Sequence, residues 1–210
     1  MKKLVINKDI FDREFSKNNE IEEVIINEGV KEIGEYAFSC CENLRKVSFP
    51  KSLRKIGSTA FFYCHNLECL NLPEGILEIE ETAFEYCYKL KRLVIPKSIT
   101  KISFGLLQGC EGIEEVILNE GILEIGDIAF ADMLNLRKIN LPQSLKKIGA
   151  NAFQNCPKLE KIVIPKGVDY IGDGLLVDSK NTKVYVEDIT KTSKFSPDWL
   201  RDTDGKILKA

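Results

Sequence analysis

The amino-acid sequence predicts an α/β solenoid, a stack of short coils that share one continuous hydrophobic core. Three features recur along the chain and support this fold class. They are a doublet of an apolar residue and proline, a doublet of alanine and phenylalanine, and a short segment of alternating apolar residues. Each returns after 23 residues with no insertion. A fixed period of this length is typical of proteins in which each unit stacks on the next.

Both doublets stay in phase over seven copies. The apolar–proline position is occupied in order by Ile26-Asn27, Phe49-Pro50, Leu72-Pro73, Ile95-Pro96, Leu118-Asn119, Leu141-Pro142 and Ile164-Pro165. The Ala-Phe position is occupied by Ala37-Phe38, Ala60-Phe61, Ala83-Phe84, Leu106-Leu107, Ala129-Phe130, Ala152-Phe153 and Leu175-Leu176. We therefore expect about seven coils of equal length, stacked in register.

The copy spanning residues 44–66 shows the expected structure of one coil. Val47 and Phe49 alternate with polar residues, which predicts a short strand with one buried face. Pro50 ends this strand because proline has no backbone N–H to donate. Gly57 then turns the chain, and residues 58–64 are expected to form a helical turn. About eight of the 23 positions face inward, so only stacked coils can bury them. They are Leu44, Val47, Phe49, Leu53, Ile56, Ala60, Phe61 and Cys64.

The spacing from Leu44 to Phe49 matches the first half of the leucine-rich repeat pattern. Where that pattern has asparagine, this chain has Gly29, Ser52, Gly75, Ser98, Gly121, Ser144 and Gly167. We therefore expect no asparagine ladder. The longer motif L-x-x-V-x-F-P-x-x-L-x-x-I-G-x-x-A-F-x-x-C resembles the BspA-like leucine-rich repeat family over residues 21–187. This resemblance implies a right-handed leucine-rich-repeat superhelix, and proteins often displayed at microbial surfaces, where some act in adhesion.

The two ends of the chain are expected to cap the stack, which divides it into residues 1–20, 21–187 and 188–210. Residues 2–7 resemble a first edge strand, with Phe11 and Phe15 folded over the open core. At the other end, residues 183–187 are expected to form a last strand. Trp199 is expected to pack against the last coil, although a tail that docks on another molecule is the alternative.

Composition argues against several classes of function. The 30 basic and 32 acidic residues leave a net charge of −2, without the basic excess of a nucleic-acid-binding protein. No window approaches the run of about 18 apolar residues that a membrane span needs. The start, MKKLVINKDIFDREF, is not typical of a secretory signal. Seven cysteines cannot all pair within one chain, which favours the cytoplasm, whereas the family resemblance implies the cell surface or secretion.

The sequence offers little support for an active site or a metal site. One column holds Cys41, Cys64, Cys87, Cys110, Met133 and Cys156, which we interpret as buried free thiols in the core. Cys64 precedes His65, the only histidine, but adjacent side chains on a turn do not face one another. His65 is expected in a solvated turn, and Cys69 on an exposed strand face. Residues 202–205 match only a fragment of a calcium loop, so a plain turn is favoured. No enzymatic activity, cofactor or metal is expected.

Two outward-facing groups are candidates for binding. Acidic and basic residues alternate between coils at the strand start, which stabilises the stack and needs no ligand. Beside them, an outward column contains several apolar residues on a solvent face, where a partner protein can dock. The candidate binding residues are Arg92, Val94, Ile117, Asn140 and Val163. A second candidate is an aromatic group on the turn side, formed by Tyr36, Phe62, Tyr63, Tyr86 and Tyr88.

Two hypotheses for function remain open from the sequence. The first is a non-enzymatic protein–protein interaction or adhesion module that presents an extended rigid surface to another protein, such as a host or cell-surface protein. The alternative is an intracellular structural scaffold or a self-assembling repeat protein joined through its ends. A monomer is favoured for the first hypothesis, while self-association is required by the second.

Overall fold

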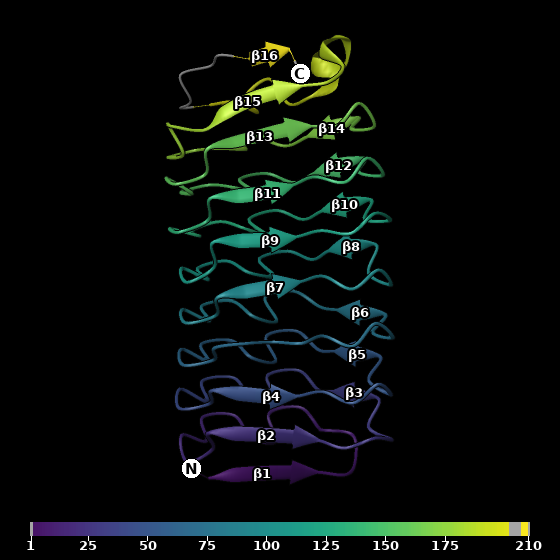
Figure 1. The fold of residues 1–210 in the computed structure, drawn as a ribbon, viewed down its shortest axis with the longest axis vertical. Coiled ribbons are helices and arrows are strands. Elements are labelled where there is room, and N and C mark those ends of the chain that lie inside the picture. The colour runs from purple at the N-terminus through teal and green to yellow at the C-terminus, as the bar shows by residue number, and fades with distance from the viewer. Residues whose placement is uncertain (1, 202–206, 210) are drawn as a thin grey trace.

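The computed structural model describes residues 2–201 and 207–209 and confirms the predicted solenoid, a parallel β-structure of about nine coils (Figure 1). Its strands are β1 (Lys3–Ile6), β2 (Glu23–Ile26), β3 (Glu32–Ile33), β4 (Lys46–Ser48), β5 (Lys55–Ile56), β6 (Glu78–Ile79), β7 (Arg92–Val94), β8 (Lys101–Ile102), β9 (Glu115–Ile117), β10 (Glu124–Ile125), β11 (Lys138–Asn140), β12 (Lys147–Ile148), β13 (Lys161–Ile164), β14 (Tyr170–Ile171), β15 (Lys183–Val186) and β16 (Ile207–Lys209).

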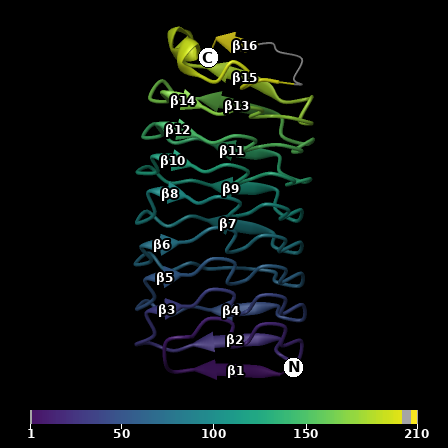
Figure 2. The same ribbon diagram turned by 180° about the vertical axis from the view of Figure 1, so that it is seen from behind.

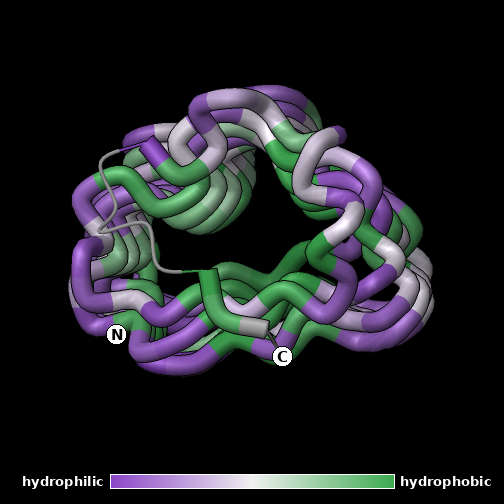
Figure 3. The backbone as a smooth tube through the Cα atoms, turned by 90° about the horizontal axis from the view of Figure 1, so that it is seen from above, coloured by the Kyte–Doolittle hydropathy of each residue, from purple (hydrophilic) through white to green (hydrophobic). Residues whose placement is uncertain are grey.

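Each coil has three sides, which we call the first arm, the second arm and the turn arm. The first arm carries the three sheets β1-β2-β4, β7-β9-β11 and β13-β15-β16. The second arm carries the sheets β3-β5-β6 and β8-β10-β12-β14 (Figures 1 and 2). Pairing between coils is parallel, so equivalent residues of successive coils lie side by side. Viewed along the stack, hydrophobic stretches line the inside (Figure 3).

The turn arm is not helical, so the α/β description fits only loosely. Among the described residues, the helix that the structure contains is a short 3-10 helix, Ile189–Lys194, near the C-terminal end. In the coil around Phe61, the N–H groups of Thr59, Phe61 and Tyr63 donate to carbonyls of the next coil. An α-helix would keep those groups within itself. Thr59 and Tyr63 have positive φ angles of 59°, which folds this arm into successive tight turns.

Aromatic stacking fills the core behind the turn arm. Phe15, Phe38, Phe61 and Phe84 form a continuous column with ring centroids 5.2–5.6 Å apart. The two leucines at positions 106 and 107 interrupt this column, and Phe130 and Phe153 resume it at 5.3 Å. Apolar burial of this kind contributes most of the stability of a repeat protein.

The two ends of the stack only partly match the predicted caps. Phe15 is half-buried and stacks on Phe38, but Phe11 is 67% exposed, so its predicted place over the core is wrong. Trp199 is buried and packs edge-on against Phe195, which confirms its predicted position. Its backbone carbonyl accepts a hydrogen bond from the Leu175 N–H at 2.8 Å. Strand β15 occupies the predicted last position, but β16 adds one more strand beyond it.

Polar side chains tie neighbouring coils together at several positions. Ser52 accepts from the Gly29 N–H and donates to the Val30 carbonyl, which explains the alternation of glycine and serine. The expectation that asparagine plays no such part is wrong. The side-chain amides of Asn66 and Asn135 each donate to a carbonyl of the preceding coil, at 2.7 and 2.8 Å. They do so from a position of the repeat other than the one where leucine-rich repeats carry asparagine.

Candidate functional site

Four of the five predicted binding residues lie together on the first arm. Val94, Ile117 and Asn140 are direct neighbours across strands β7, β9 and β11, and Arg92 is on β7 beside them. The side chain of Val94 is 40% exposed, Ile117 is half-buried, and Arg92 and Asn140 are exposed. We call these four residues the first-arm patch. They place two apolar side chains between charged and polar ones on a face backed by a sheet.

Val163 belongs to a different sheet from the first-arm patch. It lies on β13, opposite Tyr185 of β15, which in turn lies opposite Leu208 of β16. Tyr185 and Leu208 extend the outward apolar column at this end, and the sequence analysis missed them. The repeat pattern was weak here, because the step from β13 to β15 is 22 residues, one shorter than the regular period.

Charges alternate across the strands as predicted for most of the stack. On the first arm, Glu115 lies opposite Arg92 on one side and Lys138 on the other, with Lys138 Nζ 3.8 Å from its carboxylate. The alternation fails at Lys161 and Lys183, which lie opposite each other with like charge. Exposed pairs of this kind contribute about 0–1 kcal/mol each.

A second alternating ladder, absent from the sequence analysis, runs along the second arm. Its members are Glu32, Lys55, Glu78, Lys101, Glu124 and Lys147. Lys55 lies 3.8 Å from both Glu32 and Glu78, and Glu124 lies 3.6 Å from Lys101 and 3.3 Å from Lys147. Within the described residues, no ion pair within 4.0 Å joins Glu78 to Lys101, so the ladder is interrupted there.

The interruption lies at the junction between two successive coils, residues 68–90 and residues 91–113. We call this junction the seam. On the second arm, β6 and β8 belong to separate sheets. On the first arm, residues 70–72 form no strand, and β4 is linked to this coil by an isolated bridge between Lys46 and Cys69. The turn arm stays bonded across the seam, with the Thr82 N–H donating to the Phe104 carbonyl at 2.9 Å. The two halves of the stack are therefore joined mainly on one side.

The seam opens where a glycine of the repeat is replaced. At the equivalent positions, a Cβ on Gly57 or Gly126 would lie 2.8 Å from a backbone nitrogen of the preceding coil. The seam has Ser103 at this position. Glu80 replaces the glycine one coil earlier, yet its N–H donates to the Ile56 carbonyl at 3.0 Å and β5 pairs with β6, so loss of the glycine alone does not separate two coils. The Ser103 hydroxyl donates to the Ile79 carbonyl at 2.6 Å, which is the acceptor that the glycine N–H uses in other coils.

A buried hydroxyl group also distinguishes the seam from the other junctions. The oxygen of Ser98 is buried without a hydrogen-bond partner among the described residues. Its equivalents Ser52 and Ser144 each bond two backbone groups of the preceding coil. Among the described residues, Ser98 makes neither of these bonds. Such an unpaired group costs about 1–3 kcal/mol, which weakens the seam.

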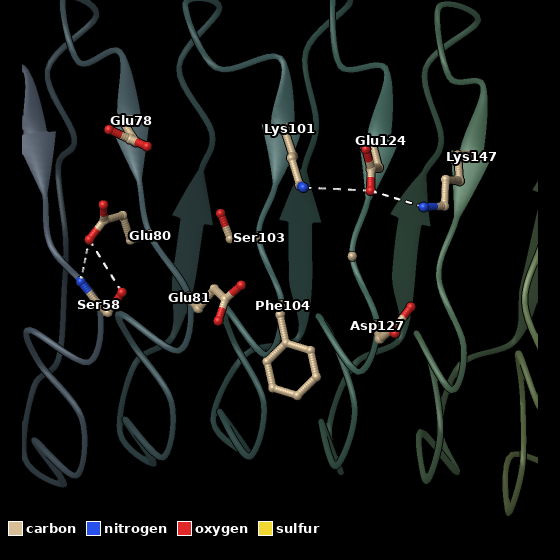
Figure 4. A pocket seen from close by; sticks show the side chains of 11 residues that line it. Ser58, Glu78, Glu80, Glu81, Lys101, Ser103, Phe104, Glu124, Asp127 and Lys147 are labelled. Atoms are coloured by element: carbon tan, nitrogen blue, oxygen red, sulfur yellow. Dashed lines mark hydrogen bonds and ion pairs between the residues drawn. The ribbon is translucent and has the colours of Figure 1, made fainter.

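The seam leaves a hollow on each strand arm. The first-arm hollow, about 400 Å³, is lined by Cys69, Asn71, Lys91, Arg92 and Val94 among others, so it adjoins the first-arm patch. The second-arm hollow, about 490 Å³, is lined by Glu78, Glu80, Glu81, Lys101, Phe104 and Asp127 among others (Figure 4). Sequence reasoning missed both hollows. The replacement of the repeat glycine by Glu80 and Ser103 in two successive coils was the available signal.

His65 lies in a turn, as expected, but its half-buried ring packs into the aromatic group. Its ring centroid is 4.3 Å from that of Tyr63 and 4.9 Å from that of Tyr88. Its Nε2 is buried without a hydrogen-bond partner among the described residues. The predicted solvated position is therefore wrong, because neighbouring tyrosines cover the ring. Burial and the adjacent Tyr63 raise the pKa of Tyr88 to about 12.

The cysteine column is buried and reduced, as predicted. The thiol of Cys64 donates to the Phe38 carbonyl at 3.2 Å, and Cys41, Cys87, Cys110 and Cys156 make the equivalent contact in their coils. Ser179 continues the column with its hydroxyl at 2.8 Å. Burial raises the pKa of Cys41 to about 11 and that of Cys156 to about 12. These thiols are structural groups, and they do not face His65.

Native-state labelling with a water-soluble maleimide is expected to modify Cys69 first, because its side chain is exposed. Cys64 is fully buried and its pKa is raised well above the ordinary value, so its thiolate is scarce and shielded. We expect a rate difference above about ten-fold, followed by mass spectrometry of peptides. The Cys69→Ser variant should lose the fast phase. Rapid labelling of Cys64 would contradict its assignment as a structural thiol.

Residues 2–201 and 207–209 contain no group of three or more His, Cys, Asp or Glu side chains arranged to hold a metal ion. None of the helices in these residues has the length and apolar character needed to cross a membrane.

Comparison of the sequence with protein families finds one match. The family described as the BspA type leucine rich repeat region matches residues 8–108 and 77–196, in six copies. These ranges cover nearly the whole solenoid, including the seam. No curated protein matches the sequence significantly.

Several solved structures share the fold. A leucine rich repeat protein of T. pallidum is 25% identical with a TM-score of 0.70, over 75% of this chain and 77% of that one. A leucine rich cell surface protein of Faecalibacterium prausnitzii is 24% identical with a TM-score of 0.74, over 89% and 63%. A leucine-rich repeat protein of Bacteroides ovatus is 23% identical with a TM-score of 0.68, over 88% and 58%. This chain therefore spans less than two thirds of the last two.

Proposed function

Because this chain belongs to the BspA type leucine rich repeat family, we propose that it binds another protein through the first-arm patch. The family is generally a protein-interaction module, and its fold is typically non-enzymatic. Function in a repeat fold resides in surface residues rather than in the scaffold. The proposal is therefore specific to Arg92, Val94, Ile117 and Asn140.

The observation that carries the proposal is the pairing of Val94 with Ile117 on the outer face. Two neighbouring apolar side chains on a sheet backed by a packed core form a rigid anchor that loses little entropy on binding. Arg92 lies on the same strand, and arginine is enriched where interfaces concentrate binding energy. The first-arm hollow adjoins the patch and can accept a protruding side chain of the partner. Val163 is the fifth predicted residue and extends the contact if the partner is long.

Display at a cell surface and a role in adhesion are the finer part of this proposal. They come from the family resemblance, and one structural neighbour is itself described as a cell surface protein. A long stack with a fixed spacing between coils suits contact with an extended surface. The partner would then be a protein of a neighbouring or host cell.

The double variant Val94→Glu/Ile117→Glu is expected to weaken partner binding by at least about 100-fold, because two carboxylates replace the apolar centre of the interface. The partner is first isolated on the immobilised chain from an extract of surface proteins, and its affinity is then measured by surface plasmon resonance. Both side chains point outward, so circular dichroism should show an intact fold. Leu77→Glu is the matched control, because Leu77 is exposed on the second arm. Equal affinity of the double variant would refute the site.

A scaffold that assembles through its ends is the second candidate function. The observation that favours it is the free edge of β1, which pairs with β2 on one side only. Val5 on this strand is half-exposed and offers an apolar contact. Light scattering of the full chain distinguishes the candidates: a mass that stays monomeric across concentrations removes the scaffold, whereas growing assemblies that Val5→Lys disperses support it.

A further inference from the structure

We propose that the second-arm hollow binds an extended basic peptide segment, with a cationic side chain lying over Phe104 between Glu81 and Asp127 (Figure 4). This hollow lies on the second arm, at β6 and β8. The first-arm patch lies on the other strand arm, at β7, β9 and β11. The inference therefore does not depend on the proposed function. It follows from the shape, the charge and the aromatic side chain of the hollow.

The shape of the hollow has a defined cause in the sequence. Ser103 occupies the glycine position of the repeat and takes the Ile79 carbonyl with its hydroxyl, so β6 and β8 do not pair. The opening of about 490 Å³ extends from β6 across β8 and β10 to β12, so it includes the unpaired junction of β6 and β8 and is wider than that junction. Its volume falls in the range of pockets that bind small ligands or short peptide segments.

The charge of the hollow favours a cation. Five carboxylates line it, from Glu78, Glu80, Glu81, Glu124 and Asp127, against two lysines. Both lysines lie against the same carboxylate, that of Glu124, at 3.6 and 3.3 Å (Figure 4). The remaining acidic side chains leave an excess of negative charge at the seam. A groove lined by one sign of charge attracts a ligand of the opposite sign.

Besides Glu124, three of these carboxylates already have partners, which locates the excess negative charge more closely. Glu78 lies 3.8 Å from Lys55. Glu80 contacts Lys55 at 2.7 Å and accepts from the Ser58 N–H at 2.9 Å. Asp127 accepts from the Ala150 N–H with one carboxylate oxygen, Oδ1, at 2.8 Å. Glu81 is exposed beside Phe104. A cation over this ring is thus flanked by Glu81 and by the second oxygen of Asp127.

Phe104 gives the hollow its chemical specificity. Its side chain is 41% exposed. The equivalent positions of the two neighbouring coils hold Glu81 and Asp127, so the aromatic ring at this position is not part of a repeated column. An exposed ring between two carboxylates can hold a lysine or arginine by its face while the carboxylates pair with the charge. Arginine fits best, because its planar group stacks on aromatic rings and bonds carboxylates in pairs.

A peptide is a better occupant than a metal ion. In the described part of the chain, no three acidic, histidine or cysteine side chains converge as metal ligands, so the carboxylates here are too far apart for one ion. They are distributed over the coils of β6 and β10, with the coil of β8 between them, which matches an extended segment with basic residues. Unpaired backbone edges of β6 and β8 border the same opening and offer partners to an extended chain.

Fluorescence polarisation with a defined probe tests this inference. The probe is a fluorescein-labelled peptide, Gly-Ser-Arg-Gly-Arg-Ser-Gly, compared with the same peptide carrying glutamate in place of arginine. We expect the arginine peptide to bind at least about ten-fold more tightly at low salt, and its affinity to fall as salt rises towards about 0.15 M. Equal binding of the two peptides would overturn the proposal.

Two variants locate the binding at the hollow, and two controls match them. Phe104→Ser, which places the serine of position 58 here, is expected to weaken the arginine peptide about five-fold, and Glu81→Lys to weaken it more through charge reversal. Leu123→Ser removes an exposed apolar side chain of the same arm, and Glu32→Gln removes an exposed carboxylate of the same ladder. Both controls should leave binding unchanged. If all four variants lower affinity equally, binding is a diffuse charge effect and the site is wrong.

A second copy of this chain is the competing occupant, and sedimentation of the unliganded protein tests it. A monomer supports the peptide site. Concentration-dependent dimers that Phe104→Ser abolishes would assign the hollow to self-association and overturn the proposal. Loss of peptide binding leaves the first-arm patch untouched, so failure here is distinguishable from failure of the proposed function.

Discussion

The Phe61→Ala variant is expected to lower the free energy of unfolding by about 3–5 kcal/mol. Phe61 is fully buried, and its ring stacks on Phe38 at 5.2 Å and on Phe84 at 5.6 Å. Phe49 packs against its edge at 6.0 Å. Alanine would leave a cavity between three rigid coils, and the hydrogen-bonded turn arm prevents them from collapsing into it. Urea unfolding followed by circular dichroism measures the loss.

The adjacent residue provides the matched control for this experiment. Phe62 is half-buried and contacts Tyr63 and Tyr86 outside the core. Phe62→Ala should therefore cost less than about 1.5 kcal/mol, because the lost contacts are exposed to water. A similar loss in both variants would show that the outer aromatic group carries as much stability as the inner column. That result would contradict the description of the phenylalanine column as the centre of the core.

The Gly149→Ala variant is expected to destabilise the protein by about 1–3 kcal/mol, although it adds only one methyl group. A Cβ at this position would lie 2.4 Å from the Asp127 backbone nitrogen and 2.5 Å from the Gly126 carbonyl carbon. These atoms belong to the backbone of the preceding coil and cannot rotate away. The coils would have to separate, which weakens the bond from the Gly149 N–H to the Ile125 carbonyl. Thermal unfolding of the variant measures the effect.

Gly75→Ala is the control for the close approach. The nearest atom to a Cβ there is the Arg54 guanidinium, at 2.8 Å, which is the end of a flexible side chain. We expect a change within about 0.5 kcal/mol. If Gly149→Ala were equally harmless, the close approach of successive coils would not be what the glycine column maintains. The proposed origin of the seam at Ser103 would then need another cause.

Much of the fold was predictable because each structural position of the coil recurs several times in the sequence. The inward column at Ile56 and the aromatic column at Phe61 recur in phase, so both could be assigned before the structure was known. The first-arm patch was predictable for the same reason, because strands of equal spacing place Val94 beside Ile117. The cap formed by Trp199 followed from the loss of the period near the C-terminal end.

The wrong predictions concern places where the local structure depends on which group a backbone N–H or a side chain contacts. Residues 58–64 have a plausible helix pattern, but the N–H groups of Thr59, Phe61 and Tyr63 donate to the next coil, so turns form instead. His65 occupies a variable position, and its burial depends on Tyr63 and Tyr88, which come from two coils. Phe11 is apolar yet exposed, because the core at that end is already closed by Phe15.

The sequence by itself determined the period, the parallel stacking, the inward residues and the outward columns of this protein. These follow from spacing alone, since a strict 23-residue step fixes which side chains become neighbours. Only the tertiary structure decided where the stack opens. Ser103 differs from glycine by a hydroxymethyl group, and whether that group is absorbed or separates two strands depends on backbone atoms of the preceding coil, including the Ile79 carbonyl. The second-arm hollow, which is the surface proposed for a basic peptide, lies at that contact between coils.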